Sequence, residues 1–99
     1  MSLDPNLAGI GHALIELRRF DEAVAVSKKA LRQNSSDGIA FRGLAAALAH
    51  LGQNAEAREA VARMLEIDPA FTISGRISRG GQTNLKLLVE GFRKAGVPE

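Results

Sequence analysis

Several residue types are absent or scarce in this chain of 99 residues, which has no cysteine, tryptophan or tyrosine and only four phenylalanines. Without cysteine, neither a disulfide framework nor a thiolate metal site can form. The composition is compatible with the reducing cytoplasm, which is where we expect the protein to act. Four aromatic rings give little support to the base stacking that single-strand binders use. We therefore expect no nucleic-acid partner.

Long apolar runs are also missing. No segment approaches the ~20 apolar residues that cross a bilayer, and the start of the chain lacks a charged segment followed by an apolar signal-type core. We therefore expect no membrane partner. Thirteen Lys and Arg residues against eleven Asp and Glu residues give a formal net charge of +2, which is too small to imply a polyanionic partner.

Helix-forming patterns account for most of what is present. Hydrophobic residues make up 45% of the chain, with many Ala and Leu and almost no strand-forming runs, and this predicts an all-α fold. Leu7, Ile10, Leu14 and Leu17 recur at spacings of three and four, which is the stripe of an amphipathic helix. A polar break follows at residues 34–38.

The pattern returns in a second copy, at the small and apolar positions that would pack, and no insertion is needed to keep the register. Identical pairs are Gly9 and Gly43, Ala13 and Ala47, Leu14 and Leu48, Leu17 and Leu51, Glu22 and Glu56, Ala23 and Ala57, and Leu31 and Leu65. The two residues of every pair are 34 positions apart. A fixed period of this length indicates helix-pair repeats.

The repeat sets the expected organisation of the chain. We predict two helix pairs over residues 4–35 and 38–69, a short helical turn and loop over residues 70–82, and a capping helix over residues 83–96. Asp4 and Pro5 are expected to open the first helix, and Thr83 or Asn84 the last. The last helix is expected to cover the apolar end of the stack.

These residues resemble the tetratricopeptide repeat, whose unit is a helix, a turn and a second helix with a period of ~34 residues. The resemblance implies a superhelix of α-helical hairpins that acts as a scaffold for a protein or peptide partner and has no catalytic role. Three residues of the first copy depart from the family pattern, because the family usually has glycine at Arg18, a bulky residue at Ser27 and proline at Ser35. The residues that carry the resemblance are Leu7, Ile10-Gly11, Leu14, Ala23 and Ala30, then Phe41, Leu44-Ala45, Leu48, Gly52, Ala57, Met64 and Pro69.

The tail over residues 67–99 is similar to the tail that follows tetratricopeptide repeats in some bacterial class III adenylate/guanylate cyclases and related signalling proteins. DPAFTIS, an Arg-rich break and LLVEGFRKAGVPE carry this similarity. It implies that the chain is the C-terminal part of a larger bacterial signalling protein. The alternative is a dimerisation or regulatory segment of such a cyclase, whose catalytic domain would lie upstream. A rival hypothesis is a homodimer through the Leu7 end of the stack. This chain leaves that end uncovered if the parent protein has further repeats before it.

Catalytic and metal chemistry have little support in the sequence. His12 and His50 are the only histidines, and Glu16, four residues after His12, is thin support for a metal site. Ser27 lacks a convincing general base, and Gly80-Gly81 lacks the Lys and Ser or Thr of a phosphate-binding loop. We therefore expect no enzyme, no catalytic residue, no metal and no cofactor.

The groove is the remaining candidate site. In tetratricopeptide stacks the first helix of each pair lines the concave wall. The resemblance therefore predicts that a set of residues on these two helices is exposed in the groove, and that Ala8 and Ala49 are exposed with them. Arg42 is placed to pair with an acidic group of a peptide. Substitution of Arg42 and His50 is predicted to weaken partner binding with little loss of helicity. The predicted peptide-binding groove residues are His12, Ile15, Glu16, Ile39, Arg42, Ala46 and His50.

Overall fold

A computed structural model describes residues 7–80 and 86–99, and the described residues form helices and no strands. The all-α fold predicted from the sequence is therefore confirmed. Asp4 and Pro5, residues 81–82 of the predicted loop, and the caps expected at Thr83 or Asn84 lie outside the described residues. The helices are α1 (Leu7–Glu16), α2 (Phe20–Gln33), α3 (Gly38–His50), α4 (Asn54–Ile67), α5 (Ile73–Gly80) and α6 (Lys86–Ala95).

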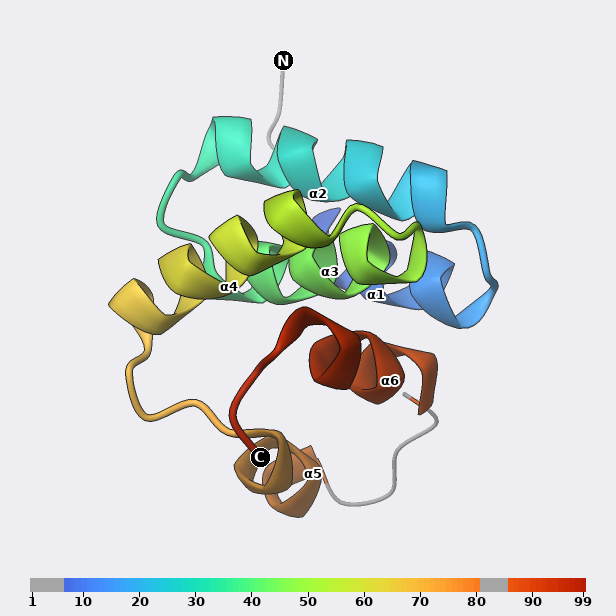
Figure 1. Ribbon diagram of the computed structural model, residues 1–99. Helices are drawn as coiled ribbons and strands as arrows, with labels where there is room; N and C mark the ends of the chain where they lie inside the picture. The colour runs from blue at the N-terminus through green and yellow to red at the C-terminus, as the bar shows by residue number, and fades with distance from the viewer. Residues whose placement is uncertain (1–6, 81–85) are drawn as a thin grey trace.

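Helix α3 is the centre of the molecule. It packs against α1 and α2 of the first hairpin, against its own hairpin partner α4, and against α6. Figure 1 shows α2 at the top, α6 beneath α3, and α5 at the bottom close to the C-terminus. The two hairpins therefore pack side by side, and the C-terminal segment folds back underneath them.

The two hairpins turn in the same way, at equivalent positions of the two copies. Arg18 has φ 62° and Gly52 has φ 78°, and in each turn the following amide donates to a carbonyl five residues earlier, Arg19 to Leu14 and Gln53 to Leu48, both at 2.9 Å. Only glycine adopts this left-handed backbone without a steric cost. Arg18 therefore takes the conformation for which the repeat pattern favours glycine.

Small residues bring α1, α2 and α3 close together. A Cβ atom added to Gly11 would lie 2.9 Å from Ser27 Oγ, and one added to Gly43 would lie 3.3 Å from the same atom. Ser27 itself is completely buried. A bulky side chain at this position, which the family pattern favours, would not fit against the two glycines.

The two ends of the C-terminal segment are held together by a pair of rings and by backbone hydrogen bonds. Phe71 and Phe92, both buried, meet edge to face with ring centroids 5.6 Å apart. The amides of Ile73 and Ser74 donate to the carbonyl oxygens of Pro98 and Glu99, each at 2.8 Å. These bonds join the start of α5 to the last two residues of the chain.

Candidate functional site

Helix α6 covers part of the wall that the sequence predicts as an open groove. Ile15 and Ala46 are both 0% exposed, and Ala8 and Ala49 are buried as well. The expectation that these four residues are exposed is wrong. The physical reason at Ala46 is Gly91 of α6, which lies so close that a Cβ atom added to it would be 2.6 Å from Ala46 Cβ.

Glu16 and His50, two more of the predicted groove residues, hold the N-terminal end of α6. The amides of Leu87 and Leu88 donate to Glu16 Oε1 and Oε2, at 3.1 and 2.8 Å. These amides belong to the first turn of α6, where no carbonyl of the same helix can accept from them. A carboxylate also favours the positive end of the helix dipole. Glu16 therefore caps a helix that lies 71 residues away in sequence.

His50 fixes the same end of α6 from helix α3. Its Nε2 atom lies 2.6 Å from the carbonyl oxygen of Leu87, and because a carbonyl only accepts, the imidazole donates. The ring stacks on Phe20, with centroids 4.4 Å apart and an interplanar angle of 11°. Substitution of His50 is thus expected to loosen α6, so it does not report on partner binding alone.

Three predicted groove residues remain accessible together. His12, Ile39 and Arg42 line a pocket of about 320 Å³, and Arg76 of α5 completes it. Arg76 is not among the predicted groove residues because it lies outside the repeats. The one signal for it in the sequence is a basic side chain close after the second helix pair.

Arg42 is held in place on two sides. Its Nη2 atom lies 3.5 Å from Asp68 Oδ2, and its Cζ atom lies 4.5 Å from the centre of the Phe71 ring. A guanidinium over an aromatic face is attracted by the ring quadrupole. The side chain is 19% exposed, so it reaches the pocket from a fixed position.

His12 contributes a neutral ring to the pocket. Its Nε2 atom donates to the carbonyl oxygen of Ile39 at 3.0 Å. Burial lowers the pKa of His12 from its ordinary value of 6.5, and the positive charges of Arg76 and Arg42 lower this pKa further, against the opposing effects of the Ile39 hydrogen bond and Asp37. The positively charged side chains that line the pocket are therefore its two arginines, of which Arg42 is also paired with Asp68.

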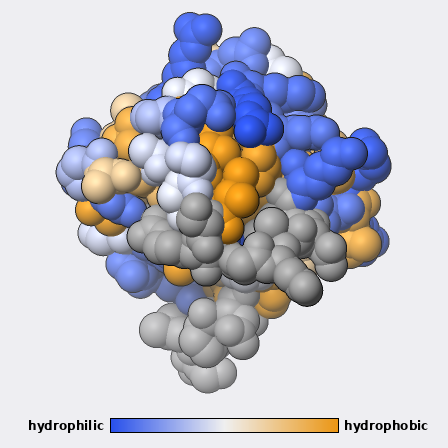
Figure 2. Space-filling view, turned by 90° about the horizontal axis from the view of Figure 1, so that it is seen from below, coloured by the Kyte–Doolittle hydropathy of each residue, from blue (hydrophilic) through white to orange (hydrophobic). Residues whose placement is uncertain are grey.

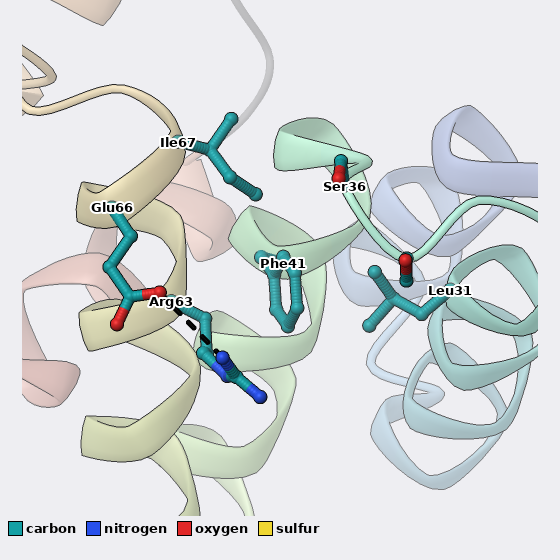
Figure 3. A pocket seen from close by; sticks show the side chains of 7 residues that line it. Leu31, Ser36, Phe41, Arg63, Glu66 and Ile67 are labelled. Atoms are coloured by element: carbon teal, nitrogen blue, oxygen red, sulfur yellow. Dashed lines mark ion pairs between the residues drawn. The ribbon is translucent and has the colours of Figure 1, made fainter.

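A second pocket lies on the opposite side of α3, between α2 and α4. Figure 3 shows Phe41 between Leu31 on one side and Arg63 and Ile67 on the other. The pocket has a volume of about 360 Å³. Its basic and acidic side chains are paired, because Arg63 Nη1 lies 3.6 Å from Glu66 Oε2. No sequence pattern points to this pocket, and its paired charges favour no particular ligand charge.

The face on which α5 and α6 lie is shown in Figure 2, where hydrophilic residues border a hydrophobic strip near the centre of the view. No three His, Cys, Asp or Glu side chains of the described residues are grouped as metal ligands. Among the helices of residues 7–80 and 86–99, none is long and apolar enough to cross a membrane.

The stacked, equivalent hairpins define a helical repeat protein. A sequence model of the tetratricopeptide repeat family matches residues 9–70, which is more than half of the chain, and the chain therefore belongs to that family. Repeats of this kind generally bind protein partners and are generally non-catalytic. Neither the curated proteins nor the solved structures include a significant match to the chain.

Proposed function

We propose that the chain is a non-catalytic protein-interaction module that binds an acidic group of a partner peptide between Arg42 and Arg76. The charge of the pocket carries this proposal. Two guanidinium groups, one from α3 and one from α5, border the pocket, and no carboxylate is among its described lining residues. An anionic group would offset the repulsion between the two arginines.

The chemistry suits a carboxylate, either the end of a peptide or an Asp or Glu side chain. A guanidinium presents a planar fork of donors that matches the two oxygens of a carboxylate. Arg42 is already ordered by Asp68 and Phe71, so its side chain loses little further freedom when a ligand binds. Each hydrogen bond to a charged group contributes ~1.5–3 kcal/mol.

Selection of displayed random peptides on the full chain tests this function. Peptides enriched in acidic residues are expected, and Arg76→Gln is expected to weaken their binding roughly tenfold to a hundredfold. Arg63→Gln is the matched control, because this arginine lies on α4 with 61% of its side chain exposed. Selected peptides without acidic residues would contradict the proposal, as would unchanged affinity of Arg76→Gln.

A second candidate function, association of two copies of the chain, is favoured by the surface of α1. Ile10 is 41% exposed and Leu17, just beyond the helix, is 64% exposed. Large apolar side chains exposed on one side of a helix are typical of a contact surface. Sedimentation at several concentrations tests whether the chain associates at all.

The wider context is supported by the similarity of the tail over residues 67–99. We infer from it a bacterial signalling protein that acts in the cytoplasm, in which this chain is an interaction or regulatory part beside a class III cyclase domain. Reading the coding sequence before residue 1 tests this inference. A cyclase domain there would support it, and a different upstream protein would overturn it.

A further inference from the structure

Ile39 is a large apolar side chain in the pocket that the two arginines border. It is 48% exposed, and it belongs to neither hydrophobic core cluster of the described residues. The next residue along α3, Ala40, is 0% exposed and packs in the core. The fold therefore places Ile39 on an accessible side of α3, and burial in the core does not account for its side chain.

The backbone at Ile39 is held in a fixed position. Its carbonyl oxygen accepts from His12 Nε2 at 3.0 Å. The start of α3 is capped, because Asp37 Oδ1 accepts from the amide of Ala40 at 3.1 Å. A branched side chain such as isoleucine is also stiff at χ1. Ile39 therefore loses little freedom when a ligand contacts it.

Ile39 and Arg42 lie one turn apart on α3, and both line the pocket. Cβ atoms three residues apart on a helix are separated by ~5–6 Å. An extended peptide advances ~3.3 Å per residue. A peptide that contacts both side chains at once therefore carries its apolar side chain within two positions of its acidic group.

The charge beside Ile39 distinguishes it from the other exposed isoleucine near this end of α3. Ile67 is 43% exposed, but it lines the second pocket, in which Arg63 and Glu66 are paired with each other. An acidic peptide is therefore drawn to the first pocket, where Ile39 is the one apolar residue among the described lining residues. The others are His12, Arg42 and Arg76.

We propose that Ile39 determines the specificity of the site, by contact with a large apolar side chain that the partner peptide carries within two positions of its acidic group. This inference rests on the proposed function, because the acidic group brings the peptide to Arg42 and Arg76. The contact removes the exposed part of Ile39 and the apolar side chain of the peptide from water, which favours binding. A peptide with only polar residues around its acidic group keeps the charge contact and loses the apolar one.

Displayed random peptides selected on the full chain supply the probe. One selected peptide is synthesised, together with a version in which its apolar residue is replaced by alanine. Ile39→Ala is expected to weaken binding of the selected peptide roughly tenfold and to change the affinity of the alanine version by no more than about twofold. Ile67→Ala is the matched control, since Ile67 has a similar exposure and does not line this pocket; it is expected to change neither affinity.

Ile39→Ala is expected to keep the fold, because alanine is the better helix former and Ile39 lies outside the core clusters; a loss of helicity by circular dichroism would assign Ile39 to the fold and overturn the proposal. Ile39→Leu keeps a large apolar side chain and should retain binding. Acidic peptides without enriched apolar residues near the acidic group overturn the role of Ile39 alone. Peptides without acidic residues overturn the proposed function as well. Equal weakening of both peptides by Ile39→Ala overturns the direct contact.

Discussion

The close approach of α6 to α3 makes Gly91→Ala a sharp test of the fold. The added Cβ atom would lie 2.6 Å from Ala46 Cβ, 2.7 Å from its Cα and 2.8 Å from its carbonyl oxygen. Two of these three atoms belong to the backbone of α3, which cannot rotate away, so α6 has to move. The free energy of unfolding should therefore fall, although alanine is a better helix former than glycine.

The size of the effect follows from two opposing terms. Overpacking a core position costs about 1–3 kcal/mol, and contact with backbone favours the upper end. Replacing glycine by alanine inside a helix contributes about 1 kcal/mol of stability. We expect a net loss of about 2 kcal/mol, which for a chain of this size lowers Tm by roughly 8–16 °C.

Gly9→Ala is the control, because it makes the same chemical change in a helix where the new Cβ atom meets nothing within 4 Å. It should raise stability by about 0.5–1 kcal/mol. Thermal unfolding is best followed by far-ultraviolet circular dichroism, since the chain has no tryptophan or tyrosine for fluorescence. If Gly91→Ala stabilises the protein as Gly9→Ala does, the packing of α6 on α3 is refuted.

Three further substitutions probe other contacts. Glu16→Gln removes the charge that accepts from two amides of α6, so chemical denaturation should show a loss of about 1–2 kcal/mol; an unchanged midpoint would show that the cap contributes nothing. Arg18→Gly relieves a left-handed backbone with φ 62° and should add about 0.5–1 kcal/mol of stability; a less stable variant would argue against this strain. The pKa of His12 is lowered from 6.5 in the folded chain, so the unfolded chain binds more protons just below pH 6.5 and stability should fall as pH drops through that value. The same pH titration of His12→Gln should be flatter, and an equal slope would assign the effect to another group.

The hairpins could be predicted from the sequence because their signal is periodic and local. Leu14 and Leu48 mark the same position in each pair, and the turns at Arg18 and Gly52 follow at the same distance. This period is readable without any knowledge of long-range contacts. The family and the all-α fold follow from this register.

The position of α6 could not be read in the same way. Its anchor, Glu16, lies 71 residues from Leu87, and nothing in the neighbouring sequence identifies a carboxylate as the cap of so distant a helix. Gly91 is a partial signal, but the intervening segment with α5 displaces it from the period that relates Gly9 to Gly43. The sequence therefore predicts a last helix, but it does not predict that Ile15 is buried in the core that this helix completes.

The bonds from Ile73 and Ser74 to Pro98 and Glu99 have a practical consequence for work with this protein. A purification tag, dye or surface linker fused after Glu99 would disturb the bonds to the start of α5, the helix that places Arg76 beside His12 and Arg42. Labels for binding assays are therefore better attached at an exposed side chain of α2, such as Lys29.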